Sequence, residues 1–513
     1  MLDSRAAPGD HRGRAPSPGS DRTPTMLGSP HPRRLSGLVA QLPGAATIGD
    51  GDPDVTDVVY RTGEVTPGAL FCAVPGSRAD GHDFAAQAVG AGAAAVLVER
   101  DVEVAAPRVV VTSVREAMGP VAAELFGHPG RELTMAGVTG TNGKTTTTYL
   151  LESIFRSAGM APAIIGTTGV RLDGRPLPLD RTTPEAPDLH RLLRRMAGEG
   201  VRAVAMEVSS HGLEQHRVGG VRFDVGVFTN LSQDHLDYHG TFEAYLAAKA
   251  RLFTPEVSER AAVNVDDEAG RSLLPGRVPT LTYAIDADAD LRAEDVRATA
   301  DGVAFRAGGV EVESRLRGRF SVYNCLAAMA AARQLGLPDR AVAEGIAALP
   351  GVPGRIEPVE AGQDFLVLVD YAHTPDSVDN VLAAARPLAR GRLVVVLGCG
   401  GDRDRGKRPL MGEAATRAAD LTVVTSDNPR SEDPAAIIAE IEPGARRGGG
   451  EYVVEPDRRA AIRLALSRAE AGDVVVIAGK GHETGQEFAD RTVPFDDRTV
   501  AREELEALAG GPS

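Results

Sequence analysis

The chain has no tryptophan, three cysteines and few aromatic residues, which make up 4% of its 513 positions. The absence of tryptophan excludes nothing. Cys72, Cys325 and Cys399 are odd in number and far apart, which argues against a disulfide framework or a paired-cysteine metal site. No apolar run approaches the roughly 18 residues of a membrane span, and no apolar signal core lies near the N-terminus. The sequence therefore predicts a cytoplasmic protein with reduced thiols and no membrane insertion.

An excess of basic charge is missing too. The formal net charge is −15, whereas a general nucleic-acid binder usually carries a basic face. A local basic pocket can still bind an anionic ligand inside an acidic protein. We therefore expect small-molecule substrates and no nucleic-acid partner. A monomer is expected too, although the charge does not bear on the oligomeric state.

The length exceeds what one hydrophobic core supports and favours about three domains. Short apolar runs typical of buried parallel strands alternate with helical segments, so the sequence predicts an α/β protein. Residues 1–34 are rich in Pro, Gly, Ser and Arg and are expected to form a disordered tail, with Met26 as an alternative start. The predicted domains are residues 35–131, a central unit at 132–350 and a Rossmann-like unit at 351–513.

The central unit begins with a glycine-rich turn. Gly140-Thr141-Asn142-Gly143-Lys144-Thr145-Thr146 follows a predicted strand at 133–138 and precedes a predicted helix at 147–158. The spacing departs from the strict GxxxxGK[ST] pattern, but strand, turn and helix provide backbone N–H groups and a helix N-terminus for phosphates. The pattern predicts nucleotide binding, with Lys144 at the terminal phosphates and the Thr145 hydroxyl on Mg²⁺.

Polar residues follow two later strands of the central unit, at 203–208 and 225–229. Ligands of an α/β sheet bind at the carboxyl ends of its strands, so Glu207 and His235 are expected to face the phosphates and to suit a second Mg²⁺. A solvent-exposed loop histidine is the alternative for His235. Lys249 lies in a predicted helix, and nothing in its surroundings distinguishes it from a solvated lysine.

Four polar clusters follow the predicted strands of the third unit. They are residues 370–376, 398–404, 426–430 and 479–483. Arg403 and Arg430 can bind a carboxylate bidentately, and Asp427 and Glu483 can bind an ammonium group. Opposed charges of this kind predict a site for a zwitterionic amino acid; surface ion pairs are the alternative. The polar loop at 77–81 follows a strand of the first unit, where a solvated turn competes with a ligand-binding role.

The motifs, and their order along the chain, resemble those of the Mur ligases, which build the peptidoglycan stem peptide. The resemblance spans about residues 35–505. It implies an N-terminal UDP-binding domain, a central ATPase domain and a C-terminal Rossmann-like domain. Within the family it points to the branch that adds diaminopimelate to UDP-N-acetylmuramoyl-L-alanyl-D-glutamate through an acyl phosphate. ATP, Mg²⁺ and CO₂, the last as a lysine carbamate, are the cofactors that it implies.

The resemblance also implies a role for individual residues. Lys144, His235 and Lys249 are expected in catalysis, and Thr145, Glu207, His235 and carbamylated Lys249 at the metals. The expected ATP contacts are Gly140 to Thr146 with Asn324, Arg355 and Asp370. The residues expected to contact the UDP-substrate are Ser77, Arg78, Ala79, Thr182, Thr183, Ser209, Gln215 and Arg217. The residues expected to contact diaminopimelate are Arg403, Asp427, Asn428, Pro429, Arg430, Gly479 and Glu483.

Thr62, Arg181 and Ser321 depart from the family pattern and are assigned no role. Three alternatives stay open. An L-lysine-adding homologue would prefer other residues at 427–430, and Arg430 argues against it. A folylpolyglutamate-type synthetase would lack a unit like residues 35–131. A nucleotide-dependent binding protein without ligase activity would need no amino-acid pocket in the third unit.

Overall fold

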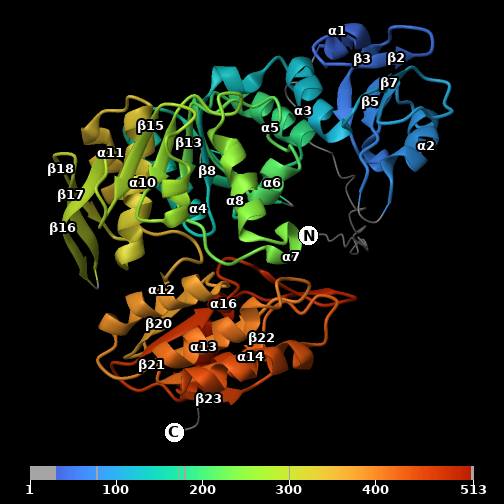
Figure 1. Ribbon diagram of the computed structural model, residues 1–513. Helices are drawn as coiled ribbons and strands as arrows, with labels where there is room; N and C mark the ends of the chain where they lie inside the picture. The colour runs from blue at the N-terminus through green and yellow to red at the C-terminus, as the bar shows by residue number, and fades with distance from the viewer. Residues whose placement is uncertain are drawn as a thin grey trace, which may run out of the picture.

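The computed structural model describes residues 31–76, 79–172, 174–177, 179, 181–299 and 301–509. Three separate α/β units follow one another along the described chain, each built on its own main sheet (Figure 1). This arrangement confirms the predicted fold class. The boundaries at 131/132 and 350/351 stay predictions. Most of the predicted tail, residues 1–30, lies outside the described residues, as do Ser77 and Arg78.

The N-terminal unit has a five-stranded sheet in the order β2-β7-β6-β5-β4, with β4 to β7 parallel. Its side chains alternate between two cores: Leu70 and Cys72 pack on one face and Phe71 on the other. Its main elements are β2 (Ala46–Ile48), β4 (Asp57–Val59), β5 (Ala69–Cys72), β6 (Ala95–Val98), β7 (Arg108–Val110), α1 (Leu35–Val39), α2 (Ala85–Gly90) and α3 (Val114–Leu125). A short pair, β1 (Arg33–Arg34) with β3 (Asp54–Val55), lies beside them.

The central unit holds an eleven-stranded sheet among the described residues, in the order β11-β10-β9-β12-β8-β13-β14-β15-β16-β17-β18. The strands from β9 to β15 in this order are parallel. They are β8 (Thr134–Thr139), β9 (Pro162–Gly166), β12 (Ala203–Glu207), β13 (Val225–Phe228), β14 (Ala261–Asn264) and β15 (Thr280–Ala284). Most of their residues are buried, as expected for parallel strands covered on both faces. The strand β15 was not predicted from the sequence.

Helices cover both faces of this sheet. Apolar side chains of α4 (Lys144–Ser157), α10 (Arg319–Gln334) and α11 (Asp339–Ala348) join one core, and those of α5 (Ala186–Gly198) join the other. The shorter helices α6 (Ser210–Glu214), α7 (Leu236–His239), α8 (Phe242–Ala250) and α9 (Glu268–Ser272) carry the connections. The predicted helix at 147–158 begins earlier, at Lys144, directly after the glycine-rich turn.

Both edges of the central sheet carry strands that the sequence did not predict. They are β10 (Gly169–Leu172) and β11 (Arg175–Leu177) at one edge and β16 (Leu291–Thr299), β17 (Gly302–Ala307) and β18 (Val310–Ser314) at the other. Except for the parallel β15–β16 contact, these added strands pair antiparallel. β18 and the start of β16 alternate buried and more exposed residues, and the rest of β16 is mostly exposed, so neither strand forms an apolar run.

The C-terminal unit has a six-stranded sheet in the order β19-β20-β24-β21-β22-β23, parallel except at β19. Its strands are β19 (Glu357–Pro358), β20 (Leu366–Asp370), β21 (Leu393–Cys399), β22 (Leu421–Ser426), β23 (Glu451–Val454) and β24 (Val474–Ala478). Helices α12 (Pro375–Ala385), α13 (Lys407–Ala418) and α14 (Pro434–Gly448) cover one face, and α15 (Arg458–Ser467) and α16 (Asp497–Ala509) cover the other. A hairpin of β25 (Gly485–Glu487) and β26 (Thr492–Pro494) follows β24.

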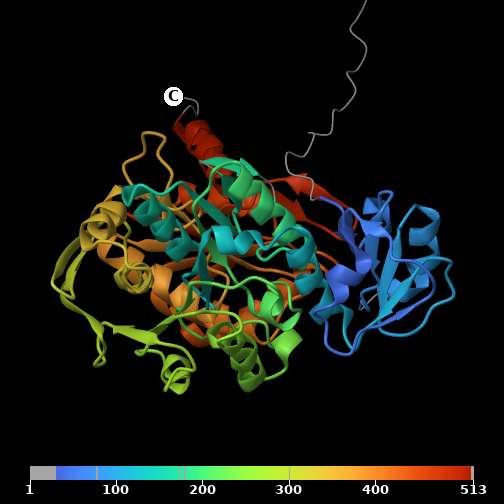
Figure 2. The same ribbon diagram turned by 90° about the horizontal axis from the view of Figure 1, so that it is seen from above.

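The C-terminal unit packs against the central unit with its strand ends toward the glycine-rich turn, and the N-terminal unit lies to one side (Figures 1 and 2). Asn142 Nδ2 donates to Asp376 Oδ2 at 2.8 Å, and Lys407 Nζ donates to Asp234 Oδ1 at 3.0 Å. Between the first two units, Tyr60 donates its hydroxyl hydrogen to Asp188 Oδ2 at 2.9 Å. Hydrogen bonds between residues far apart in sequence therefore connect the three units.

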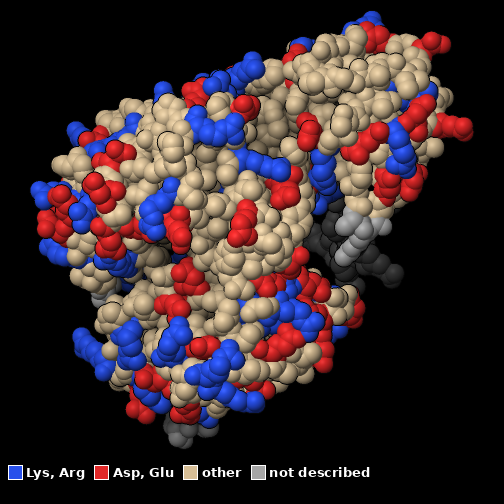
Figure 3. All heavy atoms as spheres, in the orientation of Figure 1, with Lys and Arg blue, Asp and Glu red and all other residues tan. Residues whose placement is uncertain are grey.

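Basic and acidic side chains are intermixed over the face shown in Figure 3. Within the described residues, no helix is both long and apolar enough to cross a membrane. The three cysteines are buried and unpaired, as the sequence predicted.

Candidate functional site

The glycine-rich turn connects β8 to α4 and forms the wall between two cavities. Gly143, with φ of 88°, ends the turn, and no side chain caps the first N–H groups of α4. Lys144 Nζ donates to the carbonyls of Gly140 and Thr141 at 2.9 and 2.8 Å. The turn thus combines exposed backbone donors with an ammonium group, the chemistry that a phosphate chain requires.

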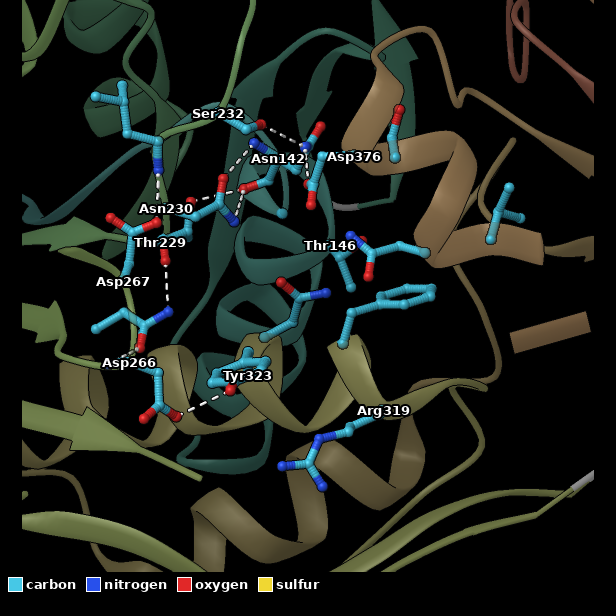
Figure 4. A pocket seen from close by; sticks show the side chains of 18 of the residues that line it. Asn142, Thr146, Thr229, Asn230, Ser232, Asp266, Asp267, Arg319, Tyr323 and Asp376 are labelled. Carbon is cyan, nitrogen blue, oxygen red and sulfur yellow. Dashed lines mark hydrogen bonds between the residues drawn. The ribbon is translucent and has the colours of Figure 1, made fainter. Parts of the chain in front are cut away.

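A cavity of about 420 Å³ opens on one side of the turn. Aromatic rings of Phe320 and Tyr323 line it together with the carboxylates of Asp266 and Asp267. The Tyr323 hydroxyl donates to Asp266 Oδ2 at 2.9 Å, and at the opposite rim the side chains of Asn142 and Asp376 point toward each other (Figure 4). Aromatic walls with a few fixed polar groups suit a nucleoside. Below, this space is called the nucleoside cavity.

The predicted ATP contacts outside the turn lie at the nucleoside cavity. Asn324, Arg355 and Asp370 all line it, although they come from α10, the connection after α11 and the end of β20. Arg355 Nη2 also donates to the Thr145 hydroxyl at 3.1 Å, and the Ile356 N–H donates to Asp370 Oδ2 at 2.8 Å. The structure therefore brings these three residues to the turn from two units.

A second cavity of about 260 Å³ lies on the other side of the turn and shares Asn142, Gly143 and Arg355 with the first. We call it the reaction cavity. All four predicted metal ligands line it: Thr145, Glu207, His235 and Lys249. Six Lys or Arg and four Asp or Glu side chains line it in all, so it is locally basic although the chain is acidic.

The Glu207 carboxylate is almost fully buried at the end of β12. Its Oε1 accepts from the Thr167 N–H and its Oε2 from the Thr167 hydroxyl, each at 3.0 Å. Burial lowers the pKa of His235 to about 3, so its imidazole is neutral near pH 7 and retains a lone pair. Among the described residues, no group of three or more His, Cys, Asp or Glu forms a ready metal cage. Mg²⁺ commonly takes only one or two carboxylates plus substrate phosphates, and this donor set fits that pattern.

Lys249 is 1% exposed and lies on α8, facing the turn. Its Nζ donates to the Gly140 carbonyl at 2.8 Å. Burial and the neighbouring Lys144 ammonium lower the pKa of Lys249 well below its usual value. An uncharged amine is the form that reacts with CO₂, so the environment of Lys249 suits carbamylation.

The residues predicted for the muramoyl substrate form a hydrogen-bonded group beside the metal residues. The Thr183 hydroxyl donates to the Glu207 carbonyl at 3.0 Å and accepts from the Ser209 N–H at 3.0 Å. Arg217 donates to the Thr183 carbonyl at 3.2 Å and to Gln215 Oε1 at 2.6 Å. Thr182 and Ser209 line the reaction cavity directly. Ala79 lies in a turn of the N-terminal unit and is not among the described residues that line either cavity.

The predicted amino-acid residues meet at the far end of the reaction cavity, at the ends of β21, β22 and β24. Arg403, Asp427, Asn428, Arg430, Gly479 and Glu483 all line it. Pro429 does not, among the described lining residues; its carbonyl accepts from the Glu432 N–H at 3.0 Å instead. Arg430, with φ of 51°, already donates to Glu487 Oε2 and to the Gly401 carbonyl, each at 2.8 Å. A ligand carboxylate would therefore share or replace these bonds.

Two lysines of the site were not predicted from the sequence. Lys407 lines the reaction cavity and donates to Asp234 Oδ1, and Lys480 is fully buried behind it, bound to Asn428 and Glu483. One signal was present: the chain has 52 arginines but only four lysines, at 144, 249, 407 and 480. The nucleoside cavity residues Asp266, Arg319 and Tyr323 carry no comparable signal.

Three family models match the chain. The model described as "Mur ligase family, catalytic domain" matches residues 55–125, "Mur ligase middle domain" matches 138–332, and "Mur ligase, glutamate ligase domain" matches 354–481. A UDP-N-acetylmuramoyl-L-alanyl-D-glutamate–2,6-diaminopimelate ligase of Geobacillus thermodenitrificans is 48% identical over 91% of this chain and 98% of its own. The chain belongs to the Mur ligase family. The resemblance seen in the sequence is thereby confirmed.

Other Mur ligases are also similar to this chain. The Streptomyces coelicolor protein of the same name is 47% identical over 95% of this chain and all of its own. A solved structure of a ligase of that name is 37% identical, with a TM-score of 0.63 over 89% of this chain and 96% of that one. A MurF ligase from Thermotoga maritima in complex with ADP is 21% identical with a TM-score of 0.63, which shows a shared fold.

Proposed function

We propose that this chain is an ATP-dependent ligase that joins diaminopimelate to UDP-N-acetylmuramoyl-L-alanyl-D-glutamate in peptidoglycan precursor synthesis. Relatives of that name match nearly the whole chain at close to half identity. The structural observation that carries the proposal is the meeting of two cavities at the glycine-rich turn, one suited to a nucleoside and one lined by opposed charges. With ATP and a UDP-linked precursor as substrates, we expect a cytoplasmic enzyme that acts as a monomer.

The cavities define a path for ATP. The adenosine would occupy the nucleoside cavity beside Asn324 and Asp370, and the phosphates would cross the turn under Arg355 into the reaction cavity. Lys144 would exchange its two carbonyl partners for phosphate oxygens. Positive charge and backbone donors placed before the reaction lower the barrier to phosphoryl transfer mainly by electrostatics.

The reaction cavity would hold the acceptor carboxylate and the amine together. The γ-phosphoryl group of ATP passes to the side-chain carboxylate of D-glutamate and gives an acyl phosphate. The amine of diaminopimelate attacks its carbonyl carbon, an amide forms, and phosphate leaves. Thr182, Thr183, Ser209, Gln215 and Arg217 would hold the muramoyl dipeptide near Glu207, and the far end of the cavity would orient the amino acid.

Mg²⁺, when bound, would neutralise charge developing on the transferred phosphoryl group. Thr145, Glu207 and His235 are its proposed protein ligands. Lys249 would contribute as a carbamate, which converts a cation into an anionic oxygen ligand. Its lowered pKa and its hydrogen bond to the Gly140 carbonyl support this role.

Phosphate release tests the proposal. With ATP and UDP-muramoyl dipeptide, we expect release with diaminopimelate and much less with L-lysine, since lysine has no second carboxylate for Arg430. Equal rates with L-lysine would identify the lysine-adding alternative. Release only with glutamate and a folate would identify a folylpolyglutamate-type synthetase. ATP binding without release in any mixture would leave a nucleotide-dependent binding protein.

A further inference from the structure

Lysine is rare in this chain, and the four lysines gather at one place. Lys144, Lys249 and Lys407 line the reaction cavity, and Lys480 lies fully buried behind its amino-acid end. A lysine offers a compact ammonium group with three donors, whereas arginine offers a wide planar fork. In a chain with 52 arginines, the position of Lys480 therefore points to a need for that compact group.

Lys480 Nζ has three hydrogens and three acceptors. It donates to Asn428 Oδ1 at 2.9 Å, to Glu483 Oε2 at 3.1 Å and to the Gly485 carbonyl at 2.6 Å. These acceptors belong to the loop after β22, the loop after β24 and the first strand of the β25–β26 hairpin. One buried ammonium thus joins the three segments that surround the amino-acid end of the cavity.

Lys480 is one of three partners that together fix which way the Asn428 amide points. Asn428 Oδ1 accepts from Lys480 and from the Glu487 N–H at 3.0 Å, and Nδ2 donates to Glu483 Oε2 at 2.7 Å. Both partners of the oxygen can only donate, and the carboxylate partner of the nitrogen accepts, so the opposite amide orientation would lose all three bonds. One hydrogen of Nδ2 remains for another partner.

The same contacts leave one carboxylate oxygen of Glu483 available to a ligand. Its Oε2 accepts from both Lys480 and Asn428, and no donor among the described residues reaches Oε1. Asn428 and Glu483 both line the reaction cavity. An amide N–H and a carboxylate oxygen therefore lie next to each other there, as the carboxylate and ammonium on one carbon of an amino acid require.

We propose that Lys480 is a positioning residue for amino-acid recognition: it orients Asn428 and Glu483 so that one donor and one acceptor face the incoming amino acid. Lys480 does not touch the ligand itself. This inference rests on the proposed function and adds to it the residue that sets the geometry of the amino-acid pocket.

The test is Lys480→Met in the full chain, with phosphate release measured against each substrate in turn. We expect the KM for diaminopimelate to rise roughly 10- to 100-fold, because two recognition groups lose a charged partner. The KM values for ATP and the UDP-substrate should stay near those of the wild type. Arg463→Met is the control: it removes an exposed cation of the same unit, whose partner Glu504 keeps its pair with Arg459, and all three KM values should stay unchanged.

A double-mutant cycle with Glu483→Gln shows whether Lys480 acts through Glu483. If it does, the loss in the double variant is smaller than the product of the two single losses. Losses that multiply fully would overturn the proposal. So would an unchanged KM for diaminopimelate in Lys480→Met.

Lys480→Gln keeps a donor in the same place and protects the test against misfolding. We expect it to fold and to show an intermediate KM, and diaminopimelate should raise its melting temperature less than that of the wild type. A Lys480→Gln protein that unfolds would indicate a purely structural role and contradict the proposal. Failure of the proposed function looks different, because then the wild type itself releases no phosphate with diaminopimelate.

Discussion

Gly143→Ala separates backbone strain from steric damage at the nucleoside cavity. Gly143 has φ of 88°, where an L-residue costs of the order of 1–3 kcal/mol. A Cβ there would also lie 2.5 Å from Asn324 Oδ1, whereas ordinary van der Waals contact begins at 3.4 Å. The Asn324 amide would therefore have to move by about 1 Å, and a misplacement of that size at an active site can cost about 100-fold in rate.

Gly159→Ala is the matched control. Gly159 lies just past the other end of α4 with φ of 77°, and a Cβ there would have no neighbour within 4 Å. Both variants should lose similar stability in urea unfolding. Only Gly143→Ala should raise the KM for ATP, by about tenfold or more, with the KM for diaminopimelate little changed. Equal KM values for ATP in the two variants would refute the placement of Asn324 and the turn at the nucleotide.

Three further outcomes follow from buried charges. Lys249→Ala should lose almost all activity, and intact-protein mass spectrometry of the wild type should show one added CO₂ that disappears in acid. Burial lowers the pKa of His190 to about 4, so its contribution to folding stability should be complete above pH 6.5 and fall by up to about 3 kcal/mol toward pH 4. Other buried histidines add to this slope, so His190→Gln should make the slope in urea unfolding shallower without abolishing it. Arg458→Met leaves Asp497 buried and unpaired and should cost about 3–5 kcal/mol of unfolding free energy, whereas an unchanged value would contradict the pairing.

The elements that sequence predicted best are those with a purely local cause. The turn at Gly140–Thr146 is defined by its glycines, by an apolar strand before it and by a helical pattern after it. The continuous apolar runs of β20, β21, β22 and β24 likewise identify strands buried on both faces. The strands β16 and β18 were missed because many of their side chains face water, which interrupts any apolar run.

The polar residues at the strand ends could also be predicted from the sequence, but the residues that they contact could not. Glu207 and His235 were placed near the turn because parallel strands end at one edge. The nucleoside cavity was not predicted, since Asp266 and Tyr323 meet only when α10 packs over the sheet. Lys480 was missed for a related reason. Its partner Asn428 follows another strand and its partner Gly485 lies in a hairpin, so the sequence around Lys480 reveals little of its contacts.

By itself, the sequence determined the α/β architecture, the phosphate-binding turn and, through the order of its motifs, the family. These depend on local periodicity, on backbone conformations that glycine favours and on residue types at strand ends. Only the tertiary structure decided that the turn separates two cavities, that Arg355 and Asp376 reach it from another unit, and that the buried Lys480 bonds to Asn428. Such contacts depend on how distant segments pack in three dimensions, which no short stretch of the chain encodes.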